Sequence, residues 1–193
     1  MGALTDAEPV LWWEDAAASL QAFRAFNVLW ELVERLEGEG SPDPAFFDAV
    51  VRCCDFMAAH AREGEALAVA LWRVQWLLLE RAGWATPFPA ETCPQDRRRW
   101  VWSPEGGLLG ADQLAAHDLS LPLTPAMLDV LMAIAARRRP ALTPELIAGL
   151  DAFFERLWAY HLGSPLRSLL HAPVDAKGEG FRPVRVAESV REG

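Results

Sequence analysis

The sequence predicts an all-α fold, a helical bundle that carries one small irregular or hairpin insert. Apolar residues recur at steps of three and four over long stretches, which is the period of an amphipathic helix. Thr-Pro pairs, typical of helix starts, stand before two apolar periodic stretches, at Thr124 and Thr143, and prolines and glycines interrupt the segment 84–123. With 193 residues, 52% of them apolar, the chain can bury a core of several helices. We therefore expect residues 1–172 to form one helical domain, with 84–123 as its insert.

Three helices are predicted in the first half of the chain. The first spans residues 16–37, and a glycine-rich stretch ends it. The second begins near Pro44, with Asp43 as its N-cap, and the third covers residues 65–82, with Gly83 as the left-handed residue that ends it. We expect the three to pack as an antiparallel bundle. The apolar positions of the first helix are Leu20, Phe23, Phe26, Leu29, Trp30, Val33 and Leu36.

The insert contains two stretches that could form short strands, Trp100–Ser103 and Gly107–Gly110. They predict a small hairpin, because prolines on both sides forbid a long helix there. These prolines are Pro87, Pro89, Pro94, Pro104 and Pro122.

Helices resume after the insert. Thr124 is a suitable N-cap for a helix that runs to about Arg139, and Thr143 is one for a last long helix that ends at Gly163. From residue 173 onward, glycine, proline and mixed charges predict a flexible tail, residues 173–193.

Charge and cysteine usage restrict the class of protein. The formal net charge is −9, so the average field repels a phosphate backbone, and we expect weak or no direct binding of nucleic acid. No secretion signal and no uncharged apolar run of about 18 residues is present, so no membrane span is expected. Three cysteines, two of them the adjacent Cys53 and Cys54, do not form a disulfide framework. These features are typical of a cytoplasmic protein.

No sequence pattern indicates catalysis. The chain lacks a metalloprotease motif, a phosphate loop and a nucleophile elbow, and its four histidines are dispersed. Two arginine runs are the most distinctive features, one at residues 97–99 and one at 137–139. Each is either a solvated helix end or loop, or a cluster that grips a carboxylate or phosphate group. The second run lies at a predicted helix C-terminus, where cations interact favourably with the helix dipole.

Several segments together resemble the C-terminal helical part of RecO, the bacterial recombination mediator. They are Ser103–Leu109 (SPEGGLL), Leu123–Leu131 (LTPAMLDVL) and Trp158–Leu170 (WAYHLGSPLRSLL). The resemblance covers about residues 16–171 and is most specific in Tyr160–Gly163 and Pro165–Ser168. It implies a non-catalytic protein of DNA repair and homologous recombination. RecO proteins also begin with an OB-fold, whereas this chain is expected to start directly at the helical part.

The resemblance also implies a zinc module, but the ligand positions have changed. The positions that match its four cysteines are Cys93, Asp96, Gly110 and Gln113. One thiolate, a carboxylate, a glycine and an amide do not make a structural zinc tetrahedron, so we expect no metal and no other cofactor. Packing of Trp100 and Trp102, together with Leu108 and Leu109, is expected to hold the insert instead.

The resemblance implies protein partners. They are the acidic, hydrophobic C-terminal tail of single-strand DNA-binding protein, which needs an apolar groove with basic flanks, and RecR. The candidate partner-binding residues are Arg97, Arg98, Arg99, Arg137, Arg138, Arg139 and Arg167. Two alternatives are a truncated or decayed RecO without mediator activity and an unrelated helical enzyme.

Overall fold

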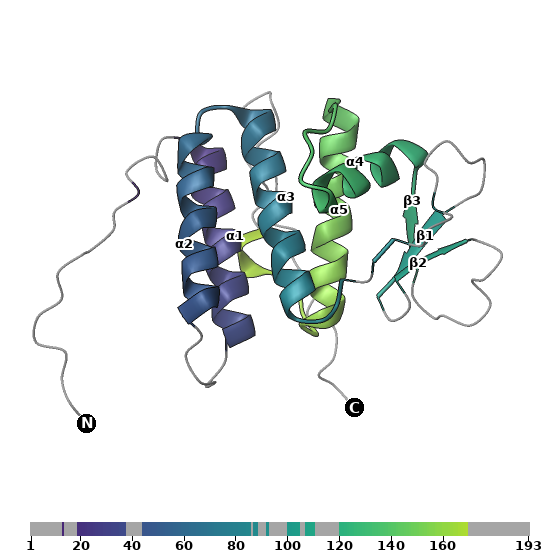
Figure 1. Cartoon of the computed structure of the whole chain (residues 1–193), viewed down its shortest axis with the longest axis horizontal. Coiled ribbons are helices and arrows are strands. Elements are labelled where there is room, and N and C mark those ends of the chain that lie inside the picture. The colour runs from purple at the N-terminus through teal and green to yellow at the C-terminus, as the bar shows by residue number, and fades with distance from the viewer. Residues whose placement is uncertain are drawn as a thin grey trace, which may run out of the picture.

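The computed structural model describes residues 13, 19–37, 44–85, 87–88, 92, 100–104, 107–110 and 120–169. These residues form a helical bundle with a small sheet against one side (Figure 1). The predicted all-α class is confirmed for the body of the chain. The expected tail, residues 173–193, lies outside the described residues, so that boundary stays a prediction.

The first three helices lie side by side, as predicted (Figure 1). They are α1 (Leu20–Glu37), α2 (Pro44–Ala59) and α3 (Gly64–Arg81). The first helix begins at Leu20 rather than at residue 16, because Ser19 caps it: the Ser19 hydroxyl oxygen accepts the backbone N–H of Ala22 at 3.0 Å. At the end of α3, Gly83 has a φ of 73°, the left-handed conformation predicted for it.

The centre of the bundle is α3, which contacts α1, α2, α4 (Pro125–Ala135) and α5 (Pro144–His161). A helix with neighbours on all sides needs apolar residues around most of its circumference. The sequence of α3 satisfies this requirement, because Ala70, Trp72 and Leu78 are all buried although they point in different directions around the helix.

Both predicted Thr-Pro helix starts are confirmed. The hydroxyl oxygen of Thr124 accepts the backbone N–H of Met127 at 3.1 Å, and that of Thr143 accepts the backbone N–H of Leu146 at 3.3 Å. In contrast, α4 ends at Ala135, four residues before the predicted end. Arg137 has a φ of 55°, and a residue in this left-handed conformation cannot continue a right-handed helix.

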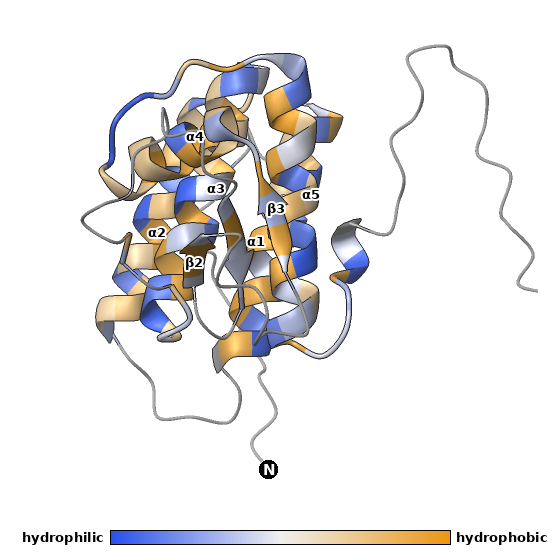
Figure 2. Cartoon of the chain, turned by 90° about the vertical axis from the view of Figure 1, so that its right-hand side faces the viewer, coloured by the Kyte–Doolittle hydropathy of each residue, from blue (hydrophilic) through white to orange (hydrophobic). Residues whose placement is uncertain are grey.

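The insert forms a three-stranded antiparallel sheet in the order β2-β1-β3. The predicted hairpin is confirmed as β1 (Trp100–Ser103) and β2 (Gly107–Gly110), whereas β3 (Leu121–Leu123) was not predicted. Pro122 fits in β3 because this strand lies at the edge of the sheet. Seen from the sheet side, the strands lie in front of the helices, and β3 consists largely of apolar residues (Figure 2).

Tryptophan packing joins the sheet to the bundle, as predicted. Trp102 is fully buried and contacts the rings of Trp76 in α3 and Phe153 in α5, with centroids 5.6 Å and 6.0 Å apart. Trp100 and Leu108 are buried as well. Among the described helices, none is sufficiently long and apolar to cross a membrane.

Candidate functional site

One face of α1 exposes large apolar side chains. Leu20, Phe23 and Trp30 are 58%, 55% and 44% exposed, although an apolar side chain of this size gains roughly 1.5–3 kcal/mol when it is fully buried. Their spacing of three and seven residues puts them on one side of the helix. An exposed apolar stripe of this kind is typical of a surface that binds another molecule.

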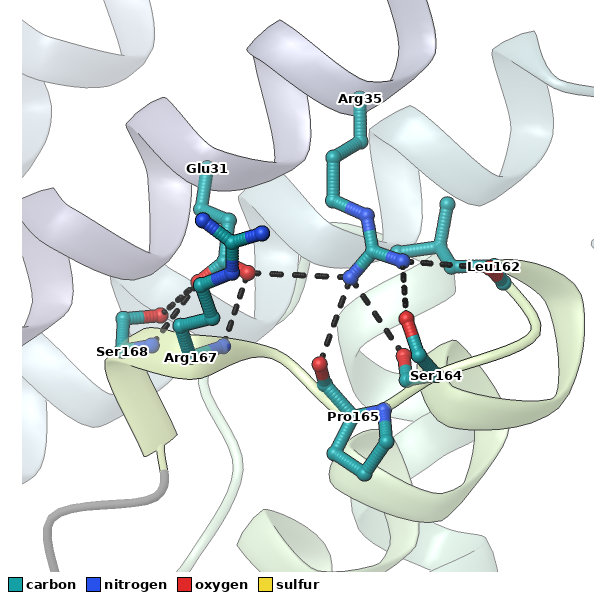
Figure 3. Close-up of polar contacts among 7 residues, drawn as sticks. All are labelled: Glu31, Arg35, Leu162, Ser164, Pro165, Arg167 and Ser168. Carbon is teal, nitrogen blue, oxygen red and sulfur yellow. Dashed lines mark hydrogen bonds and ion pairs between the residues drawn. The ribbon is translucent and has the colours of Figure 1, made fainter.

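The segment that follows α5 lies against α1 and forms the opposite wall of a groove. Arg35 of α1 holds this segment at four oxygen atoms (Figure 3). One terminal nitrogen of Arg35 donates to the carbonyl of Leu162 at 3.1 Å and to the hydroxyl of Ser164 at 2.6 Å. The other donates to the carbonyls of Ser164 and Pro165, each at 3.4 Å. The guanidinium group of Arg35 is therefore used within the protein.

Glu31, one helical turn before Arg35, fixes the short helix η3 (Arg167–Leu169) on α1 (Figure 3). One carboxylate oxygen accepts the backbone N–H of Arg167 at 2.8 Å. The other accepts both the backbone N–H and the hydroxyl of Ser168, each at 2.8 Å. Burial alone would raise the pKa of Glu31, but the hydrogen bonds from Ser168 and Arg167, together with the charge of Arg35 at 3.7 Å, lower it. Glu31 thus stays ionised at neutral pH and holds the wall in place.

The groove between α1 and the segment Ser164–Ser168 has a volume of about 820 Å³, and we call it the α1–η3 groove. Besides the apolar stripe it is lined by Arg24 and Arg167. Neither of these guanidinium groups has a hydrogen-bond or ion-pair partner among the described residues. Glu34 also lines the groove and is exposed, so the basic character is local. The arrangement suits a ligand that combines apolar side chains with a few carboxylates.

Two of the predicted arginines, Arg139 and Arg167, lie in different places. Arg167 lies on the α1–η3 groove, but Arg139 lines a different hollow of about 220 Å³, which shares no lining residue with that groove. In this second hollow the guanidinium group of Arg73 donates to the carbonyl of Arg138 at 2.8 Å and lies over the ring of Phe56. Arg139 and Arg167 therefore line different hollows, and the role of the arginine clusters in partner binding stays a prediction.

Three predicted arginines, Arg97, Arg98 and Arg99, lie outside the described residues. The same holds for three of the four positions that match zinc ligands, Cys93, Asp96 and Gln113. The fourth, Gly110, is buried in β2 opposite Trp100 and offers no side chain to a metal. A four-ligand site of the family type therefore does not fit this chain.

The sequence prediction missed Arg24, Glu31 and Arg35. No local motif marks them, because their role depends on a segment about 130 residues further along the chain. A signal was present in the apolar pattern of α1: its seven apolar positions cover a wider arc than one buried face requires. The amphipathic period alone did not separate Leu20, Phe23 and Trp30 from the core positions.

Residues 18–170 match the family model described as "Recombination protein O C terminal". No curated protein and no solved structure gives a significant match. The matched region includes the helices α1 to α5, the sheet and both walls of the α1–η3 groove. Recombination protein O is a non-catalytic mediator of DNA repair and recombination, which excludes the alternative of an unrelated helical enzyme. The chain therefore belongs to the family of the C-terminal domain of recombination protein O.

Proposed function

We propose that this domain docks partner proteins during DNA repair in the cytoplasm, and that the α1–η3 groove accepts the acidic, hydrophobic C-terminal tail of single-strand DNA-binding protein. The observation that carries the proposal is the exposed stripe of Leu20, Phe23 and Trp30 beside the guanidinium groups of Arg24 and Arg167, which have no partner in the described part of the chain. The stripe would bury the apolar end of such a tail, and the two arginines would meet its carboxylates.

The charge of the rest of the molecule supports this choice of ligand chemistry. A protein with a net charge of −9 attracts an acidic peptide only where guanidinium groups outweigh carboxylates locally. In the groove, the charge of Glu31 is offset by Arg35 and by two backbone N–H groups. The remaining charged groups of the lining are the cations of Arg24 and Arg167 and the carboxylate of Glu34, so positive charge is in excess there. Apolar contact is therefore expected to supply most of the affinity, and the arginines the preference for an acidic tail.

Fluorescence anisotropy with a labelled peptide of that C-terminal tail tests the proposal. Arg24→Glu and Arg167→Glu should each weaken binding about tenfold, because each replaces an attraction with a repulsion. Trp30→Ala should weaken binding by a similar or larger factor, because exposed aromatic residues commonly dominate such interfaces. Arg156→Glu is the matched control: it makes the same charge change on an exposed arginine of α5 outside the groove and should have little effect.

Equal binding by parent, Arg24→Glu and Arg167→Glu chains would contradict the groove as the docking site. Failure of the parent to bind the peptide or RecR would favour the alternative of a decayed RecO. We expect single-stranded DNA to bind weakly and to dissociate as salt is added. Submicromolar DNA binding that Trp30→Ala abolishes would instead make the groove a nucleic-acid surface.

A further inference from the structure

A tryptophan that precedes α1 lies at the edge of the α1–η3 groove. The indole ring of Trp13 lies 6.2 Å from that of Trp30, which lines the groove, and 6.5 Å from the ring of Phe26. Its indole N–H donates to a carboxylate oxygen of Asp55 in α2 at 2.8 Å. Trp13 therefore fixes the chain at the boundary between the α1–α2 contact and the groove.

The residues before this anchor have the chemistry that the groove suits. Residues 1–12 contain two carboxylates, Asp6 and Glu8, no lysine or arginine, and an apolar end formed by Val10, Leu11 and Trp12. The segment at the other end of the chain, residues 170–193, differs. It contains four acidic residues and four residues of the lysine and arginine type, so it offers no net charge to the basic side of the groove.

The length of this segment is sufficient. Twelve residues extend to at most about 40 Å, whereas α1, with its 18 residues, is roughly 27 Å long. A segment tethered at the edge of a site also reaches an effective concentration in the millimolar range, so even weak intrinsic affinity gives substantial occupancy.

We infer that residues 1–12 occupy the α1–η3 groove from within the same chain and compete with the partner's tail. Trp13 is the anchor, Val10, Leu11 and Trp12 cover the stripe of α1, and Asp6 and Glu8 face the basic side formed by Arg24 and Arg167. The regulatory part of this inference rests on the proposed function, because competition requires a partner that uses the same groove. The contact between segment and groove does not depend on it.

Amide and indole NMR spectra of the full ¹⁵N-labelled chain test the contact directly. The double substitution Asp6→Lys/Glu8→Lys replaces attraction with repulsion and should shift the resonances of Leu20, Arg24 and the Trp30 indole. The matched control is Asp175→Lys/Glu179→Lys, which makes the same change of net charge in residues 170–193 and should leave these resonances in place. Groove resonances that are identical in the parent and in Asp6→Lys/Glu8→Lys would overturn the inference.

Binding of the labelled tail peptide of single-strand DNA-binding protein separates the two proposals. If residues 1–12 compete, Asp6→Lys/Glu8→Lys should bind the peptide about three- to tenfold more tightly than the parent, and the control should bind like the parent. Equal binding by all three chains, with unchanged groove resonances, would overturn the competition and leave the proposed function intact. Shifted resonances without peptide binding to any chain would support the contact between segment and groove but remove its regulatory role and the proposed function.

Discussion

Glu31 and Ser168 are 137 positions apart in the sequence, yet one carboxylate oxygen of Glu31 accepts both the backbone N–H and the hydroxyl of Ser168 at 2.8 Å. The second carboxylate oxygen accepts the backbone N–H of Arg167. A single side chain of α1 thus accepts the first two backbone N–H groups of η3 and holds this helix at the α1–η3 groove. The first two predictions follow from this contact.

Replacing Glu31 should destabilise the protein. Glu31→Ala leaves two backbone N–H groups without their acceptor, and hydrogen bonds to a charged group contribute roughly 1.5–3 kcal/mol. We expect a loss of about 2 kcal/mol in the free energy of unfolding, measured by urea denaturation. Glu34→Ala is the control, since Glu34 is exposed on the same helix, and it should stay within about 0.5 kcal/mol of the parent. Equal effects of the two substitutions would contradict the role of Glu31.

The stabilising effect of Glu31 should depend on pH in a defined direction. Burial raises the pKa of Glu31, but the hydrogen bonds and the nearby Arg35 more than compensate, so the pKa in the folded protein is lower than in the unfolded chain. The contribution is then fully present above the usual glutamate pKa and is lost as the pH falls through the lowered value. Urea denaturation of parent and Glu31→Gln should give a stability difference that is constant near neutral pH and shrinks in acid. A stability difference that grows in acid would show that folding does not lower the pKa of Glu31.

Arg137→Gly should stabilise the protein. Arg137 has a φ of 55°, its N–H donates to Ile134, and the next N–H, of Arg138, donates to Ala133 at 2.7 Å, which ends α4. Glycine adopts this left-handed conformation without the cost of a Cβ, so the gain should be about 0.5–1 kcal/mol in the free energy of unfolding. Arg138→Gly removes a neighbouring arginine without that conformation and should give no gain. Destabilisation by Arg137→Gly would argue against the left-handed turn.

Trp158 should be among the most sensitive core positions. It is fully buried in α5, with its ring 6.0 Å from that of Trp84, so Trp158→Ala should cost roughly 3–5 kcal/mol. The melting temperature should then fall by about 10 °C. Trp158→Phe should cost much less, because the indole N–H has no acceptor among the described residues and most of the packing is retained. A parent-like melt of Trp158→Ala would contradict burial of this helix end.

Purified protein should contain no stoichiometric zinc, because Gly110 cannot act as a ligand and Trp102 already joins the sheet to the bundle. Elemental analysis measures the zinc content directly. A chelator should leave the helical circular dichroism signal unchanged. One tightly held zinc ion per chain would show that residues outside the family pattern complete a site.

The features predicted correctly from the sequence depend on neighbours along the chain. Thr124 and Thr143 cap their helices through the N–H groups three residues later, and Gly83 and Gly163 take the left-handed conformation at helix ends. The hairpin of β1 and β2 also joins adjacent segments. Local rules of capping and turn geometry were sufficient for all of these features.

The features that were missed depend on distant segments or on an uncommon conformation. Strand β3 forms by pairing with β1 about twenty residues away, and its Pro122 looked like an interruption. The early end of α4 at Arg137 has no glycine to indicate it. The groove itself requires α1 and the residues after α5 to meet. Among the described residues of the arginine runs, Arg139 lines another hollow. Composition alone did not distinguish the arginines that line a groove from those that do not.

The polar contact between Glu31 and η3 gives the groove a stability distinct from that of the bundle. Amide protons in the middle of α3 exchange with solvent only when the whole core opens, because α3 is covered on all sides. The amide protons of Arg167 and Ser168 require only the release of one carboxylate. The short helix η3 can therefore open locally while every long helix persists and Arg35 still holds the preceding residues of the wall. Slower hydrogen exchange at the amides of Arg167 and Ser168 would indicate an occupied groove, whether the occupant comes from this chain or from another.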